Sequence, residues 1–109
     1  MQNVYDLAHE LVRSLKETDQ YKNYQDMKAQ VAGNEALTKM LNDFQEKNMQ
    51  FQLGVMQTGA PDEELQKQVQ SLYGIVMADP LAAQYMQAEY AFTQVVSEIY
   101  QIIGEVAQS

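Results

Sequence analysis

The feature that most constrains the fold is a long alternation of apolar residues in the last third of the chain. Apolar side chains recur there at steps of four and three residues, the spacing that lines them along one side of an α-helix. Asp79 is suited to cap this helix and Pro80 to occupy its first position. The pattern therefore predicts a helix over 80–107. Its seam consists of Leu81, Tyr85, Ala88, Phe92, Val95, Ile99, Ile102 and Val106.

Shorter apolar repeats predict further helices upstream. In the first of them, Val4, Leu7 and Leu11 fall three and four residues apart and share one face. The third repeat is also a heptad seam, with Asn48 as its one polar member. A polar residue at such a position either is buried and fixes the pairing register or is exposed by the twist of the helix, and both remain open. The predicted upstream helices cover about 4–16, 19–32, 35–56 and the segment that follows Pro61.

Residues typical of helix ends mark the boundaries. Gly33-Asn34 interrupts the helical pattern, so we expect Gly33 in a left-handed conformation and Asn34 as the cap of the next helix. Gly59 lies in the clearest loop of the chain, and Pro61 is expected in the first turn of the following helix. Thr18 is the expected cap of the second helix.

Together these patterns predict an all-α protein. The 109 residues are enough for a single helical domain over 1–109. A helix over 80–107 spans about 40 Å, whereas a globular chain of this length has a radius of gyration near 13 Å. We therefore expect an elongated helical bundle with two long helices, about 35–56 and 80–107, plus shorter helices.

The last helix carries more apolar surface than one packing neighbour covers. Val96, Tyr100 and Ile103 add a flank beside its main seam. We therefore predict self-association through this helix into a homo-oligomer, with a dimer as the expected form. The predicted oligomer interface consists of Phe92, Val96, Ile99, Tyr100, Ile103 and Val106.

The charge and the absence of cysteine restrict the possible partners. The chain has a formal net charge of −8, and its seven basic residues are scattered singly. Such a surface repels nucleic-acid phosphates and anionic lipid, so we expect neither direct nucleic-acid binding nor membrane binding. No cysteine is present, which excludes disulfides and thiolate metal sites from this sequence. We expect a cytoplasmic protein.

No residue pattern indicates catalysis, a cofactor or a metal. His9 is the only histidine, and we interpret it as a surface or boundary residue. A carboxylate-bridged metal site in a helical bundle uses Glu-x-x-His pairs on two helices, and one histidine cannot supply both. Glu89, Glu98 and Glu105 are interpreted as a solvated face. Tyr21 and Tyr24 are expected to pack the second helix against the bundle rather than to stack on bases. The predicted sets of catalytic, cofactor-binding and metal-binding residues are therefore empty.

Several segments, in order, resemble the YlbF/YmcA/YheA-type family of small helical bacterial proteins. They include Tyr21-Lys22-Asn23-Tyr24, the Asn34-Glu35 break, Asp79-Pro80-Leu81 and the closing run of Tyr85, Ala88-Glu89 and Phe92. The resemblance covers nearly the whole chain. It implies a helical fold that associates with itself, no enzymatic activity and no catalytic residues to transfer.

The same resemblance implies a regulatory task. Some relatives act as partners in cytoplasmic complexes that influence RNA processing, and through it competence, sporulation and biofilm formation. Certain relatives hold an iron–sulfur cluster with cysteines, which this chain lacks, so the less characterised YheA-like branch is the nearer analogue. Our leading hypothesis is a non-enzymatic adaptor that acts through protein–protein contacts. The alternative is a carboxylate-containing metal-binding or enzymatic helical bundle of unrecognised type.

Overall fold

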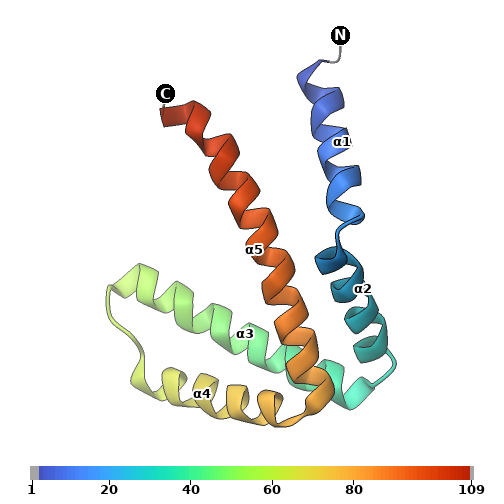
Figure 1. The fold of residues 1–109 in the computed structure, drawn as a ribbon. Helices are drawn as coiled ribbons and strands as arrows, with labels where there is room; N and C mark the ends of the chain where they lie inside the picture. Colours follow the sequence, from blue (N-terminus) through green and yellow to red (C-terminus); the bar gives the residue numbers. More distant parts are fainter. Residues whose placement is uncertain (1–2, 109) are drawn as a thin grey trace. The chain divides into compact units, whose positions relative to one another are not determined.

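A computed structural model describes residues 3–108, and within this range every regular element is a helix (Figure 1). The predicted all-α class is confirmed. The third helix runs two residues beyond its predicted end, and the last begins at the predicted proline. The helices are α1 (Val4–Lys16), α2 (Asp19–Ala32), α3 (Glu35–Thr58), α4 (Glu63–Ala78) and α5 (Pro80–Gln108).

The packing contacts divide the chain into two compact units. Unit 1 joins α1 and α2, as far as Lys28, to α5 from Tyr85 onward. Unit 2 runs from Ala29 to Gln84 and holds α3 and α4. The helices α2 and α5 contribute residues to both units.

In unit 2, α3 and α4 lie side by side as a helical hairpin (Figure 1). The apolar seam of α3 supplies the buried side chains Leu37, Leu41 and Phe44, and α4 supplies Val76, which is completely buried. The rings of Phe44 and Tyr73 lie 5.8 Å apart and join the two helices. Asn48 in the same seam is half-buried, which is intermediate between the burial and the exposure that the sequence left open.

Local hydrogen bonds set the helix ends, as predicted for three of the caps. The side chain of Asn34 accepts a hydrogen bond from the Leu37 N–H, and that of Asp79 accepts one from the Ala82 N–H, each at 3.0 Å. Thr18 caps α2 in the same way (Tyr21 N–H to Thr18 Oγ1, 3.1 Å). Each bond satisfies a backbone donor that the first turn of a helix leaves without a partner.

Two expectations about loop residues were wrong. Among the described residues the left-handed conformation occurs at Gly59, where φ is 78°, and not at Gly33. The turn after α2 is closed instead by a bond from the Asn34 N–H to the Val31 carbonyl at 2.9 Å. Pro61 lies outside α4, because the side chain of Asp62 accepts from the Leu65 N–H and takes the cap position itself.

Candidate interaction surface

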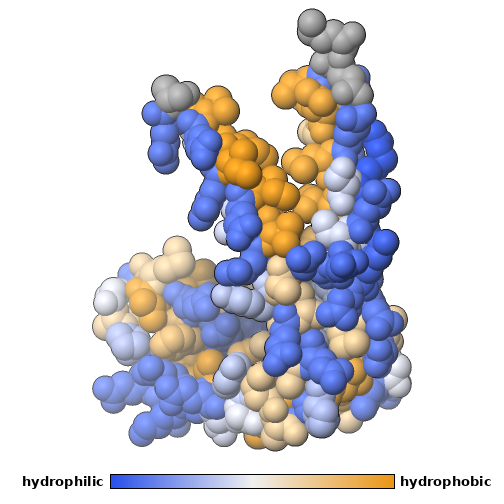
Figure 2. All heavy atoms as spheres, in the orientation of Figure 1, coloured by the Kyte–Doolittle hydropathy of each residue, from blue (hydrophilic) through white to orange (hydrophobic). Residues whose placement is uncertain are grey.

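Helix α1 has an apolar face that the described chain leaves largely exposed. None of its residues is buried, although its apolar side chains share one side of the helix. Val4 is 70% exposed and Leu7 is 51% exposed. Figure 2 shows hydrophobic residues along the side of α1 that faces α5, with hydrophilic residues on its outer side. We call Val4, Leu7, Leu11 and Val12 the α1 stripe.

The junction between α1 and α2 is closed by hydrogen bonds. The Thr18 Oγ1 donates to the Leu15 carbonyl at 2.7 Å, and the Glu17 and Thr18 N–H groups donate to the carbonyls of Ser14 and Leu15. These bonds cap α1 while Thr18 also caps α2. The α1 stripe therefore lies on a regular helix whose C-terminal end is closed by hydrogen bonds.

The C-terminal half of α5 carries the second exposed stripe of unit 1. Tyr100, Ile103 and Val106 are exposed, and Val96 and Ile99 are half-buried. Ile102 is also exposed, at 63%. All six lie within one broad side of the helix, and Figure 2 shows that this side is hydrophobic where it faces α1. We call Tyr100, Ile102, Ile103 and Val106 the α5 stripe.

Phe92, the first residue of the predicted interface, contacts its own chain. Its ring lies 5.5 Å from that of Tyr21 in an edge-on arrangement and 5.8 Å from that of Tyr24 in a stacked one. Such ring pairs stabilise a fold beyond the burial of their area. This cluster joins α2 to α5, as expected for Tyr21 and Tyr24. The other predicted interface residues lie in or beside the α5 stripe.

A carboxylate completes the cluster. The hydroxyls of Tyr24 and Tyr85 both donate to Glu89 Oε2, at 3.3 Å and 3.1 Å. The interpretation of Glu89 as part of a solvated face was wrong, because this side chain is half-buried between two tyrosines. Burial raises the pKa of the Tyr24 hydroxyl well above its ordinary value, and Tyr85 and Glu89 add to the effect. The Lys28 ammonium lies 5.0 Å from the centre of the Tyr24 ring.

Unit 2 has an exposed apolar stripe of its own. Met49, Leu53 and Met56 follow one another at steps of four and three residues on α3, so they share a side of that helix. They are exposed by 63%, 47% and 80%. This α3 stripe lies on a different side from the buried seam of Leu41 and Phe44. The sequence predictions did not include this stripe, although its spacing is visible in the sequence.

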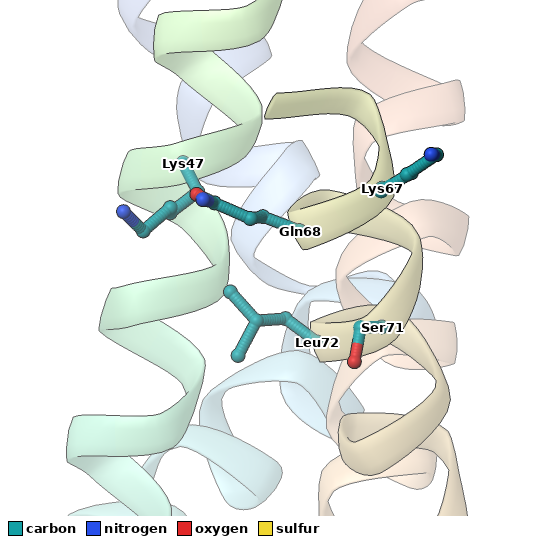
Figure 3. Close-up of a pocket in the computed structure, with 5 residues that line it drawn as sticks. All are labelled: Lys47, Lys67, Gln68, Ser71 and Leu72. Atoms are coloured by element: carbon teal, nitrogen blue, oxygen red, sulfur yellow. The ribbon is translucent and has the colours of Figure 1, made fainter. Parts of the chain in front are cut away.

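The groove between α3 and α4 is a weaker candidate. It is lined by Lys47, Lys67, Gln68, Ser71 and Leu72 (Figure 3). The two lysine side chains extend away from each other, whereas Gln68 and Leu72 point from α4 toward α3 (Figure 3). The groove therefore lacks the converging charges that would hold an anion.

The structure also shows where the residues considered for catalysis and metal binding lie. His9 is exposed on α1. Within residues 3–108, no three side chains of His, Asp or Glu type gather closely enough to hold a metal ion. In the same range, no helix is both long enough and apolar enough to cross a membrane.

Comparison with known proteins identifies the chain's relatives. Residues 4–106 match the family described as control of competence regulator ComK, YlbF/YmcA. The chain belongs to the YlbF/YmcA family. A UPF0342 protein of Symbiobacterium thermophilum is 33% identical over 94% of this chain and 91% of its own length. Another, from Staphylococcus epidermidis, is 38% identical over 93% of this chain and 89% of its own length.

Two solved structures share the fold. One is a protein of unknown function (DUF964) from Bacillus stearothermophilus, with a TM-score of 0.81, 15% identity and coverage of 98% of this chain and 94% of that one. The other is Bacillus subtilis RicA in complex with RicF, with a TM-score of 0.62, 15% identity and coverage of 96% and 93%. The family resemblance drawn from the sequence is confirmed.

Proposed function

We propose that this protein is a non-enzymatic, cytoplasmic regulatory adaptor that works by binding other proteins through its exposed helical stripes. The observation that carries the proposal is the α1 stripe, because a regular helix with no buried residue and a largely exposed apolar face is unusual in a chain that acts alone. Monomeric proteins rarely expose contiguous apolar patches unless these serve binding. The α5 and α3 stripes extend the same argument to three helices.

The relatives supply the regulatory part of the proposal. The family description refers to control of a competence regulator, and RicA, which shares this fold, has been crystallised with the protein RicF. By the resemblance described above, the finer proposal is a role in control of RNA processing, and through it competence, sporulation or biofilm formation.

The test is a quantitative capture of the tagged chain from the cells that produce it. Three variants are compared with the original: Leu7→Asp on the α1 stripe, Ile103→Asp on the α5 stripe, and Tyr90→Asp as the control. Tyr90 is 67% exposed on the opposite side of α5, so its variant carries the same change outside every stripe. The proposal expects another protein in stoichiometric amount, retained by the control and lost in at least one stripe variant.

Two results would overturn the proposal. One is the recovery of no other protein in stoichiometric amount. The other is a partner that both stripe variants retain at the level of the control. A stoichiometric transition metal in the purified protein would contradict its non-enzymatic part and favour the metal-binding alternative. Mapping of transcript ends in cells that lack the chain, with and without each variant restored, tests the finer role.

A further inference from the structure

We infer that Met49 and Met56 form a reversible oxidation site on α3, at which a peroxide converts both thioethers to sulfoxides and turns the α3 stripe from apolar to polar. The inference concerns unit 2 and goes beyond the proposed function, because its chemistry needs no partner protein. Where the α3 stripe serves the proposed adaptor, the same oxidation regulates binding there, and this consequence rests on the proposed function.

Exposure separates these two methionines from the others within residues 3–108. Met49 is 63% exposed and Met56 is 80% exposed, whereas Met27 is 9% exposed. The other methionines of this range are half-buried: Met40, Met77 and Met86. A dissolved oxidant has to reach the sulfur atom, so the rate of oxidation follows the exposure of the side chain. Met49 and Met56 should therefore react roughly sevenfold and ninefold faster than Met27, by the ratio of the exposed fractions.

The two methionines belong to one surface because they lie seven residues apart on a regular helix. Seven residues are close to two turns, so both side chains lie on the same side of α3, about 10 Å apart along its axis. Leu53 lies between them and completes the α3 stripe. Oxidation of both methionines therefore changes two of the three side chains that make this surface apolar.

The stripe lies in a segment that has no charge. From Asn48 to Pro61 the sequence contains no acidic or basic residue, although charged residues make up 20% of the chain. The polarity of this surface therefore depends on its uncharged side chains alone. A sulfoxide replaces an apolar thioether with a strongly polar group, which disrupts surfaces built from methionine. The segment has no neighbouring charge that would mask this change.

The reaction is an oxygen transfer that balances with hydrogen peroxide. A sulfur lone pair attacks one peroxide oxygen, the S–O bond forms and the O–O bond breaks; the proton of the transferred oxygen passes to the departing hydroxide, which leaves as water. The sulfur is oxidised by two electrons and the peroxide is reduced. Methionine sulfoxide reductases reverse the step: a dithiol is oxidised to a disulfide, and the oxygen leaves as water.

The helix can accommodate the product. Gln52 is exposed and lies three residues after Met49 and four residues before Met56. Residues at these separations are neighbours on a helix surface. The side-chain N–H groups of Gln52 can therefore donate to a sulfoxide oxygen on either methionine. We expect oxidation to change the surface of α3 and to leave its helical structure intact.

The first measurement is the order of oxidation in the purified full chain. The folded protein is treated with limiting hydrogen peroxide, quenched with catalase and digested, and tandem mass spectrometry quantifies the added oxygen at each methionine. We expect sulfoxide at Met49 and Met56 first, and similar rates at all methionines once the chain is unfolded in urea. Circular dichroism checks that the oxidised chain keeps its helices. Rates at Met49 and Met56 in the folded chain no higher than those of the half-buried methionines overturn the inference.

The second measurement follows the polarity of the surface by retention on a hydrophobic-interaction column. Oxidation should shorten the retention of the original chain, and methionine sulfoxide reductases for both sulfoxide epimers should restore it. Met49→Leu/Met56→Leu keeps the apolar volume but cannot form sulfoxides, so the same treatment should leave its retention unchanged. The matched control, Met40→Leu/Met77→Leu, removes two half-buried methionines of unit 2 and should respond like the original chain. Equal responses of the two double variants, or no response of the original chain, overturn the inference.

Capture of proteins from the producing cells tests the regulatory consequence. A protein that Leu53→Asp fails to capture should also be lost from the oxidised chain, and the peroxide-treated Met49→Leu/Met56→Leu chain should retain it. Retention of that protein by the oxidised chain overturns the regulatory consequence, as does a chain whose partners all survive both oxidation and Leu53→Asp; the adaptor role stands in either case. A chain that captures no protein fails the adaptor role, and the rates and the retention then decide the oxidation site by themselves.

Discussion

Replacement of Phe92 tests whether this residue stabilises unit 1 or belongs to the oligomer interface that the sequence predicted. Its ring contacts those of Tyr21 and Tyr24 from one side chain. The two ring pairs contribute together about 1–3 kcal/mol beyond their buried area. Truncation of a core Phe to Ala costs about 3–5 kcal/mol in all. Since Phe92 is half-buried, we expect Phe92→Ala to lower the free energy of unfolding of unit 1 by about 3 kcal/mol.

Hydrogen exchange read by mass spectrometry is the suitable assay, because it localises stability to peptides from α2 and α5. A loss of about 3 kcal/mol speeds exchange of protected amides around Phe92 roughly 150-fold. Phe92→Leu keeps most of the apolar volume but loses both ring pairs, so its expected loss is about 1.5 kcal/mol. Tyr90→Ala, on the exposed side of the same helix, is expected to change stability by no more than about 0.5 kcal/mol.

All variants are compared at one protein concentration, since association adds to apparent stability. A loss below about 1 kcal/mol for Phe92→Ala would refute the reasoning, because the aromatic cluster would then not join α2 to α5. A loss of dimer mass with unchanged exchange in α2 would return Phe92 to the interface.

Three further changes test separate parts of the structure. The Tyr24 pKa is raised in the folded state, so the protonated hydroxyl stabilises the fold below about pH 10, and this contribution is lost at higher pH. In urea unfolding, the original chain should therefore keep its stability advantage over Tyr24→Phe up to about pH 9. Above that pH the advantage should shrink by at most about 1.4 kcal/mol per pH unit. Gly59→Ala should destabilise the fold by about 1 kcal/mol, because φ is 78° there. Gly54→Ala should stabilise it by about 0.5–1 kcal/mol, because the added carbon lies in open space inside α3. In thermal unfolding, the first variant should therefore lower the midpoint temperature and the second should raise it. Val76→Ala, at a completely buried position, should lower the urea-unfolding free energy of unit 2 by about 2 kcal/mol, and a loss below about 0.5 kcal/mol would contradict the packing of α4 on α3.

The sequence alone determined where the helices lie. Helix ends depend on hydrogen bonds between residues three or four apart, so Asn34 and Asp79 could be assigned as caps without knowledge of the fold. The seams of α3 and α5 followed from spacing for the same reason. Where two adjacent residues compete for one local role, as Pro61 and Asp62 do, the sequence did not decide between them.

Only the tertiary structure decided what covers each apolar face. The spacing of Val4, Leu7 and Leu11 is as regular as that of the α3 seam, yet the α1 stripe is exposed, whereas the seam residues Leu37, Leu41 and Phe44 are buried. It also decided that Glu89 meets Tyr24, because these two residues lie 65 apart in sequence. Periodicity identifies the side of a helix that avoids water, but burial depends on which other helix reaches that side, and this is a property of the whole arrangement.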